Sequence, residues 1–91
     1  MSQKELKALQ QIPGVGKVIA QDLWSLGIRT VQDLEDQDPE TFYLRLCHHQ
    51  GTQVDRCMLY VFRCAIYYAS TEAPEAHLLK WWNWSDQNLA K

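Results

Sequence analysis

Apolar residues near the N-terminus recur at three- and four-residue spacing, and a glycine-rich turn divides them into two groups. The apolar positions are Leu6, Leu9 and Ile12 before the turn and Val18, Ile19, Leu23 and Leu26 after it. Because this spacing is that of one face of an α-helix, it predicts two helices. Pro13 and Gly14 end the first helix, and Gly27 supplies the left-handed position that ends the second. We therefore expect a helical hairpin whose core spans residues 4–28.

Four further helices are predicted after the hairpin, each from its own start and stop signals. Thr30 begins a short helix, and a proline at the first helical position begins another over residues 39–49. A long central helix follows at about 53–69, and a tryptophan-rich C-terminal helix and tail occupy 74–91. No segment alternates as a strand would. The sequence therefore predicts an all-α fold, a single compact bundle of about five or six helices forming one domain over residues 1–91.

The predicted helix at 53–69 is apolar on more than one side. Its main stripe comprises Val54, Cys57, Met58, Val61, Ala65 and Tyr68. The opposite face interleaves basic and aromatic side chains, namely Arg56, Tyr60, Arg63 and Tyr67. We expect this face to be covered by packing or by a dimer, because Leu59 and Ile66 lie on the same side. The alternative is an auxiliary nucleic-acid surface, in which the rings stack on bases and the guanidinium groups neutralise phosphates.

The turn itself, Gly14-Val15-Gly16-Lys17, has the composition of a phosphate-binding element. Glycine lets the backbone approach a ligand closely, and the helix that follows directs unpaired N–H groups and the positive end of its dipole to the same place. Lys17 adds a charge that could contact a phosphate oxygen. The same glycines also suit a turn that merely reverses the chain. The sequence favours the phosphate site and identifies Gly14, Val15, Gly16 and Lys17 as its residues.

Charge and other candidate chemistries limit the function. The net charge of −2 excludes a strongly basic nucleic-acid binder, although residues 1–29 are basic and residues 30–50 acidic. Five thiol or imidazole groups invite a metal interpretation, Cys47, His48, His49, Cys57 and Cys64. Their spacing is not that of a zinc site, so we predict no metal and reduced cysteines that serve packing. No nucleophile, acid and base converge, and we expect neither an enzyme nor a cofactor.

The ends of the chain add localisation and one packing expectation. Residues 1–6 lack the apolar core of a signal peptide, and the longest apolar stretch, 57–69, is interrupted by Arg63 and is too short to cross a bilayer. We therefore expect a cytoplasmic protein with no membrane association. Three tryptophans end the chain, and we expect Trp81 or Trp82 to close the small core.

The chain resembles the small bacterial family of "pathogenicity locus" helix-hairpin-helix proteins and their mitomycin-resistance-associated relatives. The resemblance covers about residues 6–86 and rests on five segments, at 12–17, 26–34, 38–40, 59–65 and 78–84, the last being the tryptophan-rich Leu78-Leu79-Lys80-Trp81-Trp82-Asn83-Trp84. A more distant similarity is to the C-terminal domain of competence regulators. The resemblance implies an all-helical, DNA-associated module without catalytic residues.

Two functions remain as expectations. The first is a non-catalytic module that binds DNA weakly and without sequence preference through the amides of residues 14–17. The second is a protein-interaction or homodimerisation module, with an unknown partner, in which the hairpin is only architectural. A single hairpin motif fits both, since a lone motif gains affinity when a dimer doubles it.

Overall fold

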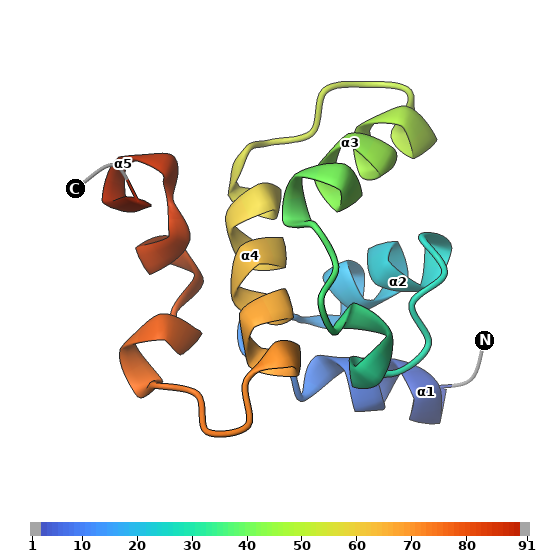
Figure 1. Ribbon diagram of the computed structural model, residues 1–91. Coiled ribbons are helices and arrows are strands. Elements are labelled where there is room, and N and C mark those ends of the chain that lie inside the picture. The colour runs from blue at the N-terminus through green and yellow to red at the C-terminus, as the bar shows by residue number, and fades with distance from the viewer. Residues whose placement is uncertain (1–2, 90–91) are drawn as a thin grey trace.

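The computed structural model describes residues 3–89, and within this range every regular element is a helix (Figure 1). The helices are α1 (Gln3–Gln10), α2 (Lys17–Ser25), α3 (Pro39–Gln50), α4 (Cys57–Ser70) and the short α5 (Asp86–Leu89). Three short 3₁₀ segments connect them, η1 (Val31–Leu34), η2 (Ala76–Leu79) and η3 (Trp81–Trp84). The predicted all-α fold class is confirmed.

Helix α4 is the centre of the molecule. Figure 1 shows α1, α2 and α3 on one side of it and the C-terminal segments on the other. Helix α4 packs against α3 and η1 on the first side and against η2 and η3 on the second. Its buried residues are Leu59, Val61, Phe62, Cys64, Ala65 and Ile66. The apolar character on both sides of this helix is thus used within the chain.

The apolar positions predicted for the first two helices form the inner face of the α1–α2 pair, with one exception. Leu6, Leu9, Ile12, Leu23 and Leu26 are buried. Val18, which the periodicity placed on the same face, is instead 70% exposed. The physical reason is helical spacing, because Ile19, Leu23 and Leu26 already form the stripe that faces α1, and Val18 falls beside it.

Helix α4 begins at Cys57, four residues later than the predicted start at 53. The preceding residues 53–56 are outside the helix, and tertiary contacts occupy the backbone groups of Val54. Val54 donates its N–H to the sulfur of Cys47 at 3.4 Å and accepts a hydrogen bond from the Tyr43 hydroxyl. The Asp55 carboxylate accepts the N–H of Cys57 at 2.9 Å, which satisfies an amide at the new helix start.

The C-terminal segment does not form the single helix expected from residue 74. It folds as η2, η3 and α5 because side chains bond carbonyl groups that a continuous helix would use. The Trp84 indole donates to the Leu78 carbonyl at 2.7 Å, and the Asn83 amide donates to the His77 carbonyl at 2.6 Å. These bonds turn the chain so that it lies along α4 (Figure 1).

Candidate functional site

Of the four predicted site residues in the turn between α1 and α2, Val15 is buried and the other three are exposed. The Val15 side chain lies in the core, and its N–H donates to the Ile12 carbonyl at 3.0 Å. Gly14 adopts a left-handed conformation with φ of +83°. Its missing side chain is needed by the fold, since a Cβ there would lie 3.2 Å from Cδ1 of Trp81.

Gly16 and Lys17 form the second half of the turn, and both are exposed. Gly16 is the residue before α2, with extended backbone angles, and no side chain caps the helix after it. A Cβ built on Gly16 meets no atom within 4 Å, so the space in front of this residue is open. The Gly16 carbonyl accepts the N–H of Ala20 at 2.9 Å, which closes the first turn of α2. The first amides of an α-helix have no partner within the helix, and no side chain caps those of α2.

Two lysine side chains lie beside this turn. Lys7 and Lys17, with Leu6 and Gln10, line a depression of about 210 Å³ between α1 and α2. Lys80 is exposed and directly precedes Trp81, whose ring packs against Gly14. We call Gly16, Lys17, Lys7, Lys80 and Trp82 the hairpin surface. Three of these five residues are lysines, so the group is cationic although the whole chain is acidic.

Sequence reasoning missed Lys7, Lys80 and Trp82 as members of this surface. Lys7 lies on the helix before the turn, and the other two lie near the opposite end of the chain. The contact between Trp81 and Gly14 brings that end of the chain to the turn. The one signal in the sequence was the unusual density of tryptophan at positions 81–84, for which we expected a packing role. Trp81 does pack against the core, as expected for Trp81 or Trp82.

The basic and aromatic face of α4 is in contact with the C-terminal segment. Arg56 pairs with Asp86, and Arg63 also pairs with Asp86, at 3.0 Å. Arg63 donates to the Trp84 carbonyl at 2.8 Å, and its side chain is only 11% exposed. The hydrogen bond from Arg56, assisted by Arg63, lowers the pKa of Asp86 to about 2. These two arginines therefore hold the end of the chain against α4.

The two tyrosines of that face also contact the C-terminal segment. The Tyr60 hydroxyl is 3.4 Å from a carboxylate oxygen of Asp86. Tyr67 packs its ring on Trp84, with centroids 5.3 Å apart, and its hydroxyl accepts the N–H of Glu75 at 2.9 Å. The four residues Arg56, Tyr60, Arg63 and Tyr67 thus lie together as predicted, and each contacts a residue between 75 and 86.

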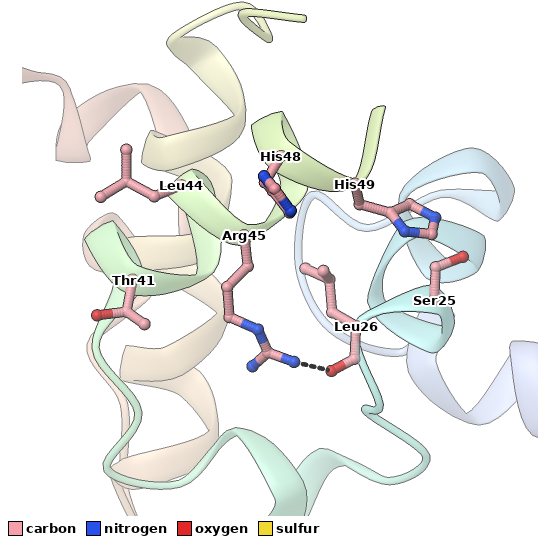
Figure 2. Close-up of a pocket in the computed structure, with 7 residues that line it drawn as sticks. All are labelled: Ser25, Leu26, Thr41, Leu44, Arg45, His48 and His49. Atoms are coloured by element: carbon pink, nitrogen blue, oxygen red, sulfur yellow. Dashed lines mark hydrogen bonds between the residues drawn. The ribbon is translucent and has the colours of Figure 1, made fainter. Parts of the chain in front are cut away.

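A separate groove of about 460 Å³ lies between the end of α2 and α3 (Figure 2). Figure 2 shows Arg45 reaching from α3 to the Leu26 carbonyl, to which it donates at 2.9 Å. His48 and His49 lie at the end of α3, and Leu44 beside them is 64% exposed. The groove is on α2 at the end opposite the glycine turn, so it is not continuous with the hairpin surface.

The three cysteines occupy different environments. Cys57 is exposed, Cys47 is half-buried and Cys64 is buried in α4. Burial raises the pKa of the Cys64 thiol to about 11. Among the residues that the structure describes, no three histidine, cysteine or acidic side chains are grouped closely enough to hold a metal ion. Over the same residues, no helix has the length and apolarity needed to cross a membrane.

The fold defines a class, a small all-α protein in which a glycine turn joins two packed helices and a tryptophan-rich end closes over that turn. The sequence profile of the family described as "Pathogenicity locus" matches residues 2–90. The chain belongs to this family, as its resemblance suggested. Comparison with curated proteins and with solved structures gives no match.

Proposed function

We propose that this chain is a cytoplasmic, non-catalytic DNA-binding module whose α1–α2 pair is a helix-hairpin-helix motif. In this proposal the amides at the start of α2 bind a backbone phosphate, and no base is read. The observation that carries the proposal is the exposed Gly16, where α2 has no side-chain cap and a Cβ would meet no atom within 4 Å.

The geometry of the turn limits which backbone amides can donate to the phosphate in this proposal. The Val15 N–H already donates within the turn, so it is not available to a ligand. Gly14 has a structural role, since it allows the turn to pack against Trp81, and in this proposal it does not contact the phosphate. The phosphate donors are therefore the amides of Gly16 and Lys17 and of the residue that follows. The Lys17 ammonium supplies a further charge-assisted contact.

Charge supports weak and non-specific binding. Phosphate contacts from a few cations release few counterions, so affinity is modest and falls with salt. The hairpin surface holds Lys7, Lys17 and Lys80, whereas the chain as a whole carries −2. Such a module suits an auxiliary grip on DNA, in which repeated or paired modules multiply the affinity.

The test is the binding of a labelled duplex, followed by fluorescence anisotropy at low and moderate salt. Gly16→Val fills the open approach with a β-branched side chain, and the extended backbone at this position tolerates it. We expect this variant to lose at least about tenfold in affinity. Gln21→Val, at an exposed position later in α2, is the matched control and should bind as the parent does. Unchanged binding by Gly16→Val, or no binding by the parent, contradicts the proposal.

The alternative, a protein-interaction or homodimerisation module, has less support. The two surfaces that the sequence offered for it were the outer face of α4 and the tryptophan-rich end. These surfaces contact each other through Arg56, Arg63, Tyr67 and Trp84. Sedimentation of the parent at micromolar concentration tests the alternative, and a dimer that Leu44→Glu abolishes would favour it over DNA binding.

A further inference from the structure

Three large apolar side chains are exposed among the described residues, Val18, Leu44 and Trp82. Val18 is in the first turn of α2, and Trp82 is the neighbour of Trp81, whose ring packs against Gly14. Trp82 is 52% exposed, which is a large apolar area for a residue two positions after an exposed lysine, Lys80. An exposed ring in such a place suggests a ligand with a flat face.

Trp82 is held in place although its ring is exposed. Its ring meets that of Trp81 edge to face, with centroids 5.8 Å apart and an angle of 83°. Its carbonyl accepts the Asn88 side-chain amide at 2.9 Å. Trp81 in turn packs on the core and on Gly14. A ring held by its backbone and by a neighbouring ring loses little conformational freedom when a second ring packs on its exposed part.

We propose that Trp82 stacks on an unpaired base of single-stranded DNA whose backbone phosphate lies at Gly16 and Lys17. This inference rests on the proposed function, because the same phosphate contact positions the strand. The ligand class follows from chemistry: Lys17 and Lys80 attract an anion, and the exposed indole of Trp82 accepts an aromatic ring, so the ligand carries both groups. Bases of a duplex stack on one another, whereas those of a single strand are free to stack on the protein.

The arrangement predicts a preference between DNA forms. Duplex DNA makes only the phosphate contact, and single-stranded DNA makes the phosphate contact and the stacking contact. Stacking of one base on an aromatic side chain changes affinity by about fivefold or more. We therefore expect an oligothymidine of about ten nucleotides to bind at least about fivefold more tightly than a duplex of equal length. The preference for the single strand should depend little on the base sequence of the DNA, because every base has a flat face.

The experiment compares labelled oligothymidine and duplex on the parent, Trp82→Ala and Trp82→Phe by anisotropy. Trp82→Ala should remove the preference for the single strand over the duplex, whereas Trp82→Phe should retain part of the preference. Trp24→Ala is the matched control, since Trp24 is a partly exposed tryptophan at the far end of α2 that stacks under Arg29. It should leave both affinities unchanged.

A second arm uses only the parent protein. An oligothymidine with abasic sites keeps every phosphate but has no base to stack, so it should bind as weakly as the duplex. Equal binding of abasic and normal strands overturns the stacking proposal, as does an unchanged preference in Trp82→Ala. Either result leaves the phosphate site intact if Gly16→Val still weakens duplex binding. Loss of the Gly16→Val effect contradicts the phosphate site itself.

Discussion

The indole of Trp81 lies directly against Gly14, so that a Cβ on the glycine would approach Cδ1 of the ring to 3.2 Å. This contact joins the N-terminal hairpin to the C-terminal segment. Gly14 also has a φ of +83°, a backbone angle that residues with a side chain rarely adopt. Two independent reasons, a backbone angle and a neighbouring ring, therefore require glycine at this position.

We expect Gly14→Ala to lower the free energy of unfolding by about 1–2 kcal/mol, because alanine at positive φ is strained and its methyl group displaces Trp81. Gly16→Ala is the control. Gly16 has a negative φ and open space, so alanine there should leave the stability unchanged or raise it by up to about 1 kcal/mol. Urea unfolding monitored by tryptophan fluorescence measures both variants. Equal loss in the two variants would argue against the contact.

Local periodicity predicted much of this fold. The helices at the hairpin and at residues 39–49 follow from spacing, from a proline start and from glycine ends, all of which act within a few residues. The Thr30 start is confirmed in the same way, because the Asp33 carboxylate accepts the Thr30 N–H at 3.1 Å. The Gly51 end is also confirmed, with a φ of +70°.

Tertiary contacts determine the parts of the fold that local periodicity did not predict. The Trp84 indole and the Asn83 amide bond carbonyl groups of residues near them and so break the helix that the pattern favoured. Trp81 reaches Gly14 across most of the chain, and spacing along the sequence carries no information on such a pair. The candidate site was therefore predicted at the turn, whose residues are adjacent in sequence. Lys80 and Trp82 were missed, because they reach the turn only through the folding of the C-terminal segment against it.

Arg63 is the strongest link between α4 and the C-terminal segment. Its guanidinium contacts Asp86 at 3.0 Å and the Trp84 carbonyl at 2.8 Å, and its side chain is almost fully covered. We expect Arg63→Met to lower the free energy of unfolding by about 2 kcal/mol, because the partners lose a charged donor. Arg56→Met, at a half-exposed site that shares the Asp86 carboxylate, should lower the free energy of unfolding by less than Arg63→Met does. Urea unfolding ranks the two variants, and the reverse order would contradict this assignment.

Asp86 makes the stability depend on pH below about 4. Arg56 and Arg63 lower its pKa to about 2 in the folded protein, whereas an unfolded aspartate titrates near about 3.9. A lowered pKa means that the stabilisation is complete above pH 4 and is lost as the pH falls towards 2. We expect Asp86→Asn to flatten the stability profile between pH 4 and 2. Chemical unfolding across this range measures the profile, and an unchanged slope would contradict the ion pairs.

The cysteines should differ in reactivity. Thiolate is the reactive form, and burial raises the pKa of Cys64 to about 11 and shields it from reagents. Cys57 is exposed, although the hydrogen bond to Asp55 raises its pKa also. At pH 8 we expect iodoacetamide to modify Cys57 in the folded protein and Cys64 only after addition of urea. Mass spectrometry of the peptides identifies the sites, and rapid modification of Cys64 without urea would contradict its burial.

The salt dependence of DNA binding tests the role of Lys17 separately from that of the amides. If its ammonium neutralises one phosphate, Lys17→Gln should reduce the slope of the logarithm of the binding constant against the logarithm of salt concentration by about 1. Gly16→Val should weaken binding while changing this slope less, because it blocks amides and removes no cation. Arg29→Gln is the control, since Arg29 stacks on Trp24 beyond the end of α2. A slope equally reduced by Arg29→Gln would point to diffuse attraction rather than a site at the hairpin.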